Sequence, residues 1–405
     1  MRKAFAGPSS GSANSALMQK LVLKPREEGR LRAGHLWVFS NEIAAMPSGS
    51  QAGDLVEVVT SRGESLGSAL FHPHSLISAR LLGAGVEEMD RAFFQERIAT
   101  AARLRDQVMQ GETSYRLVYG ESDFLPGLVV DRYGEHFVLQ ILSAGMERRR
   151  DLIVEALGSL FQPAAVVERN DAQLRTYEGL PLQKSILAGS LSGPIEIREN
   201  GIRYRIDLLE GQKTGFFLDQ KFNRRVVAEL CRGREVLDAY CNSGGFGLNA
   251  VRVGAASVVA VDASGPALDI ARSNAELNDA EIRFEQADVS RFLNHCLEDG
   301  RRFDVVILDP PSFVPRKKDI PRARKAYQKV NELAARVLRP EGILVTASCS
   351  LHLREEIFYQ IVRQSAERCG RKLQLLERRQ QAPDHPIHPT MPETAYLKLG
   401  VFRVL

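Results

Sequence analysis

The sequence predicts an α/β protein in which a doubly wound C-terminal domain of about seven strands follows a small β-rich domain and an α+β domain. Three observations support this. The chain has 405 residues, more than a single hydrophobic core ordinarily serves. Hairpin signals concentrate before about residue 208, whereas apolar strands alternate with amphipathic helices after it, which is the pattern of a parallel sheet. A composition of 44% hydrophobic and 26% charged residues is typical of a globular protein.

The β-rich domain is expected at residues 21–86, after a Gly/Ser-rich stretch, 1–20, which we expect to be a flexible tail with Met18 as an alternative start. Alternating apolar and polar residues around Arg62-Gly63 predict a hairpin. Trp37 and Phe39 come before this hairpin, in a basic stretch. They fill the core of a small barrel, or they belong to an RNA-binding surface whose cations contact phosphates. Those cations are Lys24, Arg26, Arg30 and Arg32.

The α+β domain is expected at residues 87–193, beginning with a linking helix. Its predicted elements are a helix over 88–109, a hairpin turning at Tyr133-Gly134, a helix over 146–161 and a strand over 164–169. A further hairpin, turning at Asn200-Gly201, opens the third domain, which we expect at 194–405.

The third domain contains apolar stretches that alternate with helical segments. Its predicted strands are 235–240, 257–262, 282–288, 304–309 and 342–348. Two later stretches, 372–378 and 395–405, are separated by a loop rather than a full helix. We therefore expect them to form an antiparallel pair at one edge of the sheet.

Composition excludes several classes of protein. No apolar stretch approaches the roughly 18 residues of a membrane span, and the N-terminus lacks the apolar block of a secretion signal. We therefore expect a cytoplasmic protein with no membrane partner. No two of the five cysteines are spaced as C-x-x-C, so neither a disulfide framework nor a metal site is expected. The net charge of +4 is modest, so its distribution along the chain is more informative than its sum.

A glycine cluster follows the first strand of the third domain. Gly244, Gly245 and Gly247 stand between a strand and a helix, an arrangement that lets backbone approach a ligand. The strands of this domain also end in or near acids. An isolated acid at such a position is more often a helix N-cap, but a series of them beside a glycine loop predicts a nucleoside-containing cofactor. The acids are Asp238, Asp262, Asp288 and Asp309.

The stretches LDAYCNSGGFG, VDAS, QAD and DPPSF, in this order and spacing, resemble the motifs of class I S-adenosylmethionine-dependent methyltransferases. The upstream run EGQKTGFFLDQKFNRR resembles a signature of rRNA 5-methylcytosine methyltransferases that carry an N-terminal PUA domain, an α+β middle domain and a Rossmann-like catalytic domain. The resemblance covers almost the whole chain from about residue 20. It implies S-adenosylmethionine as cofactor, rRNA (23S in the bacterial family) as substrate, and a homodimer.

The resemblance also implies a set of cofactor-binding residues. The three glycines would approach the methionine part with Asp238 near its amino group, while Asp262 would hold the ribose and Asp288 the adenine amine. For Asp219, an alternative is the N-cap of the helix that follows it. The complete set is Thr214, Phe217, Asp219, Gln220, Arg224, Asp238, Tyr240, Gly244, Gly245, Gly247, Asp262, Ser264, Asp288, Val289 and Asp309.

Cys349 is the residue on which the reaction type depends. Methyl transfer to nitrogen requires no protein nucleophile, whereas carbon 5 of cytosine becomes reactive only after a nucleophile adds at carbon 6, a task suited to a thiolate. Cys349 ends a predicted strand at the sheet edge that carries the acids. As an isolated cysteine it would be a core residue. Cys241, within the glycine-loop region, is the rival nucleophile, and the other cysteines fall in predicted helical segments: Cys231, Cys296 and Cys369.

The stretch Asp309-Pro310-Pro311-Ser312-Phe313 supplies the rest of the predicted site. The prolines stiffen the turn, and Phe313 either stacks on the target base or belongs to the core. Asp309 could bind the cytosine amine or a ring nitrogen. The loop lacks the second cysteine of some related enzymes, so the base that removes the carbon-5 proton is open; Asp309 or a water that it orders is our hypothesis.

A basic run follows at residues 312–329. Such a run is usually a solvated face, but beside a catalytic loop it predicts contacts with RNA phosphates. Together with Pro310, Pro311 and Phe313 and the N-terminal Lys24, Arg26 and Arg32, the predicted substrate-binding residues in it are Arg316, Lys317, Lys318, Arg322 and Arg324.

Two alternatives remain beside the cytosine-5 methyltransferase. One is an rRNA methyltransferase that acts on a guanine nitrogen without using Cys349. The other is a non-catalytic RNA-binding assembly factor.

Overall fold

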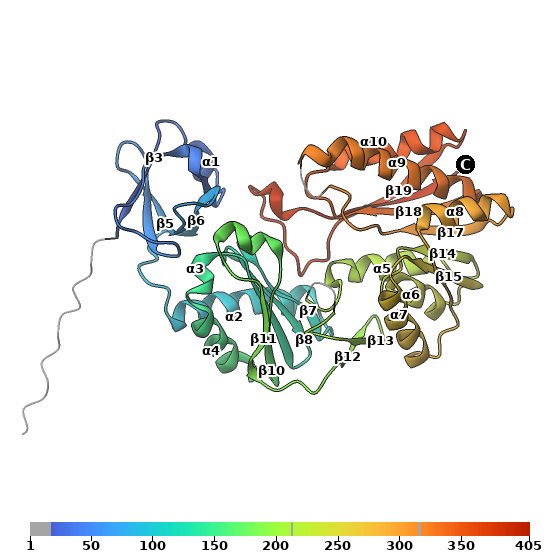
Figure 1. The fold of residues 1–405 in the computed structure, drawn as a ribbon, viewed down its shortest axis with the longest axis horizontal. Coiled ribbons are helices and arrows are strands. Elements are labelled where there is room, and N and C mark those ends of the chain that lie inside the picture. Colours follow the sequence, from blue (N-terminus) through green and yellow to red (C-terminus); the bar gives the residue numbers. More distant parts are fainter. Residues whose placement is uncertain (1–17, 212–213, 315–316) are drawn as a thin grey trace, which may run out of the picture. The chain divides into compact units, whose positions relative to one another are not determined.

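The structure is a computed structural model that describes residues 18–405 except 212–213 and 315–316. Most of the predicted tail, residues 1–17, lies outside the described residues. The chain divides into two compact units, Met1–Met89 and Asp90–Leu405, and each is described by itself (Figure 1).

The first unit contains a six-stranded sheet with the order β2-β6-β5-β4-β1-β3. The predicted hairpin at Arg62-Gly63 is confirmed, because β4 and β5 pair antiparallel and Gly63 has φ of 84°, which glycine adopts without strain. The elements of this unit are β1 (Lys20–Leu23), α1 (Gly29–Arg32), β2 (Trp37–Phe39), η1 (Ser40–Glu42), β3 (Ile43–Ala45), β4 (Leu55–Val59), β5 (Ser65–Phe71) and β6 (Ile77–Gly83).

Trp37 and Phe39 do not fill the core of this sheet. They alternate with Val38, which is fully buried, whereas both rings are only half-buried. Successive side chains of a strand point to opposite faces, so the rings lie on the face of β2 away from Val38. Arg30 packs over Phe39 and Arg80 over Trp37, at 4.8 and 5.7 Å from the ring centroids. The barrel-core interpretation is therefore wrong for these two residues.

The second unit begins with a five-stranded sheet of order β11-β10-β9-β8-β7, against which the predicted linking helix α2 and helix α4 lie together (Figure 1). The hairpin predicted at Tyr133-Gly134 is confirmed by the antiparallel pair β8 and β9. The elements are α2 (Arg91–Val108), β7 (Ser114–Tyr119), η2 (Gly120–Asp123), β8 (Leu128–Tyr133), β9 (His136–Ile141), α3 (Ala144–Glu147), α4 (Arg150–Phe161), β10 (Ala165–Asn170), η3 (Gln173–Glu178) and β11 (Gln183–Gly189).

A separate antiparallel hairpin, β12 and β13, connects this sheet to the rest of the unit. Its turn is the predicted Asn200-Gly201, with φ of 52° and 76°. Buried Ile197 and Tyr204 of the hairpin share one apolar cluster with Val138 of β9 and Leu248 of the following domain. This shared core explains why residues 90–405 form one compact unit.

The remaining sheet has seven strands in the order β16-β15-β14-β17-β18-β20-β19. The first five are parallel, while β20 pairs antiparallel with both β18 and β19. The predicted doubly wound domain and its antiparallel edge pair are thus confirmed. The elements, with the hairpin, are β12 (Ile195–Glu199), β13 (Ile202–Ile206), η4 (Leu218–Gln220), α5 (Lys221–Glu229), β14 (Glu235–Ala239), α6 (Gly245–Arg252), β15 (Ser257–Asp262), α7 (Gly265–Leu277), β16 (Arg283–Gln286), α8 (Val289–Glu298), β17 (Phe303–Leu308), η5 (Lys317–Asp319), α9 (Ile320–Val337), β18 (Leu338–Ser348), α10 (Glu355–Arg368), β19 (Leu373–Arg379), η6 (Pro392–Thr394) and β20 (Lys398–Val404).

Helices cover both faces of this sheet. In β17, Val306 and Leu308 pack with α8, α9 and α10, whereas the alternate residues Val305 and Ile307 pack with α5 and α6. A strand buried on both faces has no polar face, which accounts for its continuous apolar sequence. Within the described part of the chain, no helix has both the length and the apolar character needed to cross a membrane.

Candidate active site

The glycine loop begins where β14 ends and lies over a buried carboxylate. Asp238 is 1% exposed, and its Oδ2 accepts a hydrogen bond of 2.7 Å from the Gly247 amide. A Cβ atom at Gly247 would lie 3.2 Å from that oxygen, a tight contact that glycine avoids. Burial raises the pKa of Asp238 to about 7, with further increases from Asp309 and Asp262. Its Oδ1 has no hydrogen-bond partner among the described residues.

The two following acids organise the loops after their strands. Asp262 accepts from the amides of Ser264 (2.9 Å) and Asn242 (3.0 Å), and therefore joins the glycine loop to the start of α7. Asp288 is the N-cap of α8 and accepts from the Arg291 amide at 2.9 Å. For Asp288 the capping interpretation is confirmed.

The segment upstream of α5 holds several of the predicted cofactor-binding residues, and most of their polar groups bind protein. Thr214 donates to Asp131 at 2.5 Å. The guanidinium of Arg224 forms a buried bidentate pair with Glu199 (2.7 and 2.9 Å) and donates to the carbonyl of Phe217. The Arg224 side chain also packs against the glycine loop, since a Cβ at Gly245 would lie 2.9 Å from its Cδ.

Asp219 and Gln220 lie in η4. Asp219 accepts from the Tyr396 hydroxyl at 2.5 Å and does not cap α5, whose N-cap is Gln220; the capping alternative is wrong for Asp219. Gln220 donates to Asp309 Oδ2 at 3.0 Å. This contact brings the upstream segment to the DPPSF loop, which sequence spacing alone does not predict.

A cleft of about 400 Å³ lies against the glycine loop. Its lining includes Asn242 and Ser243 of that loop, Ser264 at the start of α7, and Gly211 and Gly215 of the upstream segment. The volume falls in the ordinary range of small-ligand pockets. The other predicted cofactor residues border the same sheet edge: Phe217 and Tyr240 are half-buried, Gly244 is the N-cap of α6 with φ of 83°, and Val289 is buried at the start of α8.

These residues fit S-adenosylmethionine. A buried carboxylate oxygen without a partner suits the ammonium of the methionine part, and the glycines admit backbone close to it. In the arrangement that the resemblance implies, Asp262 would accept from the ribose hydroxyls and Asp288 from the adenine amine.

Cys349 lies directly after β18 and is half-buried. Both neighbouring serines belong to one hydroxyl cluster, because the Tyr327 hydroxyl lies 2.8 Å from Ser348 Oγ and 3.0 Å from Ser350 Oγ. Ser350 Oγ also lies 2.9 Å from Ser312 Oγ of the DPPSF loop. The hydroxyl cluster therefore fixes the turn that carries the thiol and joins it to that loop.

The rival thiol is in a different environment. Cys241 is 5% exposed, and burial, together with Asp238 and Asp262, raises its pKa far above the ordinary value. Since the thiolate is the nucleophilic form, Cys241 is poorly suited to attack. Cys231 and Cys369 end up just beyond α5 and α10 rather than inside helices, and Cys296 lies in α8.

The DPPSF loop follows β17, next to β18 in the sheet. Pro310 is buried and Pro311 exposed. Phe313 is half-buried, with its ring centroid 4.8 Å from that of Tyr327 and 6.5 Å from that of Tyr240. The ring therefore packs among aromatic residues and is also partly exposed. Its position is compatible both with a core role and with stacking on the target base.

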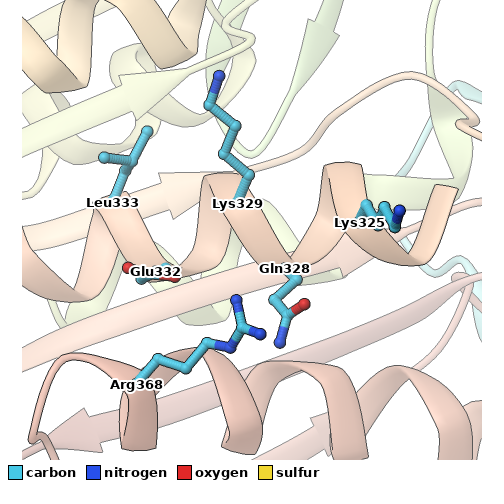
Figure 2. A pocket seen from close by; sticks show the side chains of 6 residues that line it. All are labelled: Lys325, Gln328, Lys329, Glu332, Leu333 and Arg368. Carbon is cyan, nitrogen blue, oxygen red and sulfur yellow. The ribbon is translucent and has the colours of Figure 1, made fainter. Parts of the chain in front are cut away.

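The basic run continues into α9. Arg316 lies outside the described residues, and Lys317 begins η5. Lys318 and Arg322 are exposed and Arg324 is half-buried. Farther along, a groove of about 380 Å³ between α9 and α10 carries Lys325, Lys329 and Arg368. Figure 2 shows Arg368 of α10 directed toward Gln328 of α9, while Lys329 projects away from them. Cations thus follow α9 from the loop into this groove.

The predicted cations of the first unit lie on its surface. Lys24, Arg26 and Arg32 are exposed. Lys24 donates to the carbonyl of Asn41 and Arg32 pairs with Glu64. Exposed pairs of this kind contribute little to stability.

Sequence reasoning missed two residues around the thiol: Tyr327, whose hydroxyl joins the two serines that flank Cys349, and Lys398. Lys398 is 5% exposed and donates to the Ser350 carbonyl at 2.7 Å. The signal for it was present, because a single lysine in the apolar stretch AYLKLGVF is unusual in a buried strand.

Comparisons with known proteins give the family. Residues 183–403 match the model described as S-adenosylmethionine-dependent methyltransferase, and residues 21–83 match the PUA-like domain. A protein named Ribosomal RNA large subunit methyltransferase I from Shewanella denitrificans is 42% identical, over 95% of this chain and 99% of that protein. One of the same name from Vibrio vulnificus is 39% identical, over 95% of this chain and 98% of that protein.

Solved structures share the fold. A protein from Streptococcus mutans described as a SAM-dependent methyltransferase matches with a TM-score of 0.83 at 20% identity, covering 95% of this chain and 100% of that one. SMU.776, described as a methyltransferase and solved in complex with SAH, matches with a TM-score of 0.84 at 21% identity, with the same coverage. This chain belongs to the family of S-adenosylmethionine-dependent methyltransferases, with S-adenosylmethionine as its cofactor and a PUA-like domain at its N-terminal end.

Proposed function

We propose that this protein methylates carbon 5 of a cytosine in ribosomal RNA, 23S rRNA in particular, through a covalent bond between Cys349 and carbon 6 of the base. The observation that carries the proposal is the placement of the half-buried Cys349 in a turn whose Ser350 contacts Ser312 of the DPPSF loop. The names of the relatives support rRNA as the substrate, and so do the PUA-like domain and the cations along α9.

The chemistry assigns distinct tasks to the protein's residues. The Cys349 thiolate adds to carbon 6 and makes carbon 5 nucleophilic. S-adenosylmethionine supplies the methyl group. The proton at carbon 5 must then leave before the carbon–sulfur bond breaks and the thiolate is released. Asp309, or a water that it orders, is our proposal for the acceptor of that proton, because Gln220 orients its carboxylate at this edge of the sheet.

RNA that contains 5-fluorocytidine tests the covalent step. Fluorine at carbon 5 cannot leave as a proton, so the adduct persists and survives denaturing electrophoresis. We expect a cross-linked band with the unchanged protein and with Cys369→Ala, the control for the other half-buried thiol, and no band with Cys349→Ala.

The other outcomes identify the alternatives. Full methyl transfer to rRNA by Cys349→Ala would contradict the proposal and favour a guanine-nitrogen methyltransferase. Failure to bind S-adenosylmethionine in calorimetry would favour an assembly factor without activity. Bisulfite mapping of 23S rRNA from a deletion strain, with and without rescue, locates the modified cytosine. Sedimentation of the pure protein tests the homodimer that the family resemblance implies.

A further inference from the structure

Lys398 is a buried cation at the turn that carries Cys349. It opens β20, where it pairs in register with Ser348 of β18. Residues paired in this way across antiparallel strands project to the same face. The ammonium reaches past Ser348 and donates to the carbonyl of Ser350 at 2.7 Å. The residues directly before and after the thiol are therefore both neighbours of Lys398.

The hydrogen bond to one carbonyl does not account for a buried lysine by itself. A buried ammonium loses most of its hydration, and Lys398 is only 5% exposed. Burial lowers the pKa of Lys398 to about 8, while Cys349 and Glu355 act in the opposite direction and favour its charged form. Lys398 consequently keeps its proton at neutral pH, where a thiolate beside it would compensate its charge.

Two described titratable groups near this turn, Tyr327 and Glu355, carry no positive charge that could replace that of Lys398. Tyr327, on α9, contacts the flanking serines through a neutral hydroxyl, because burial raises its pKa above the ordinary value. Glu355, at the start of α10, is an acid and would oppose a thiolate. Of these three residues, Lys398 is the one that supplies a positive charge to Cys349.

We propose that Lys398 is the positioning residue whose ammonium stabilises the thiolate of Cys349. The thiol loses its proton to solvent, and the resulting negative charge is compensated by Lys398. The inference deepens the proposed function, since the adduct at carbon 6 neutralises the sulfur and its breakdown returns the thiolate. The same ammonium thus favours both the attacking and the released form of the sulfur.

Alkylation of Cys349 tests this without RNA or cofactor, so the result does not depend on which base is methylated. The protein reacts with iodoacetamide between pH 5.5 and 10, and mass spectrometry of the Cys349 peptide gives the rate. The midpoint is the pH at which the alkylation rate reaches half its maximum. For the unchanged protein we expect it to lie below the pKa of a free thiol, which is roughly 8.5. An opposite charge at short range shifts such midpoints by about one to three pH units.

The key variant is Lys398→Gln, which is neutral but keeps an N–H donor for the Ser350 carbonyl. We expect its midpoint to rise by about one pH unit, which slows alkylation about tenfold at pH values well below the midpoint. Lys398→Arg, which keeps the charge, should restore most of the shift. Lys372→Gln, at an exposed lysine, is the matched control, and the Cys369 peptide of each sample reports any general change in thiol exposure.

An unchanged midpoint in folded Lys398→Gln would overturn the inference. So would a midpoint of the unchanged protein at or above that of a free thiol, a result that needs no variant to fold. A loss of adduct with 5-fluorocytidine RNA despite a low midpoint would count against the proposed function and leave the role of Lys398 intact.

Discussion

The buried carboxylate of Asp238 should lower the stability of the free protein and strengthen cofactor binding. We therefore expect Asp238→Asn to raise the melting temperature and to weaken the affinity for the cofactor. The substitution keeps the shape of the side chain and an oxygen that accepts the Gly247 amide bond. It removes the charge that burial disfavours. It also removes the charge that we expect to pair with the ammonium of the methionine part.

The size of the loss in binding follows from the type of hydrogen bond. A hydrogen bond to a charged group contributes about 1.5–3 kcal/mol, which corresponds to about 10- to 150-fold in the dissociation constant at a pH where the carboxylate is ionised. The free protein should in contrast melt at a higher temperature, by roughly 2 °C for each kcal/mol of removed desolvation cost.

The pH dependence has a defined sign. The pKa of Asp238 is raised to about 7 from an unfolded value near 4. Between these values the folded chain holds a proton that the unfolded chain has released, so the free energy of unfolding falls as the pH rises through that window. Cofactor affinity changes the other way. The ionised fraction grows from about 3% at pH 5.5 to about 50% at pH 7, which tightens binding by about 15-fold while the ligand's amino group stays mostly protonated.

Isothermal titration with S-adenosylmethionine at these pH values, and thermal unfolding of the free protein, measure both quantities. Asp238→Asn should show a weak and nearly pH-independent affinity together with a raised melting temperature. The reasoning is refuted if the variant binds the cofactor as tightly as the unchanged protein at pH 7, or if its melting temperature falls.

Three further perturbations test other parts of the structure. Gly245→Ala should lower the free energy of unfolding in urea by about 1–3 kcal/mol, because its Cβ would press on Arg224. The control is Gly158→Ala, in the open middle of α4, which should be neutral or stabilising. Equal effects of the two substitutions would contradict the packing argument. Glu199→Ala should lower the free energy of unfolding by about 3–5 kcal/mol, because it leaves Arg224 buried without its partner. A loss below about 1 kcal/mol would show that the Arg224–Glu199 pair does not stabilise the fold. Lys329→Ala should reduce the dependence of log affinity for rRNA on log salt by about 0.7–0.9; an unchanged slope in filter binding would remove this lysine from the RNA surface.

Local sequence predicted those features that local geometry controls. The turn at Asn200-Gly201 requires positive φ at both residues, and the chain adopts it. The acids after successive strands lie at one edge because the carboxyl ends of parallel strands point the same way. This made the position of Asp238, Asp262 and Asp309 foreseeable before any contact was known.

The surroundings of Cys349 needed the tertiary structure. Nothing in local periodicity specifies that β20 lies between β18 and β19, yet this strand order pairs Lys398 with Ser348, the residue that precedes the thiol, 50 positions away. The same applies to the contact between Gln220 and Asp309, which joins segments 89 positions apart. Strand direction and turn chemistry are local, so the residues that reach the active edge of the sheet could be predicted from the sequence. The contacts among them could not, because strand order and side-chain packing depend on the burial of the whole chain.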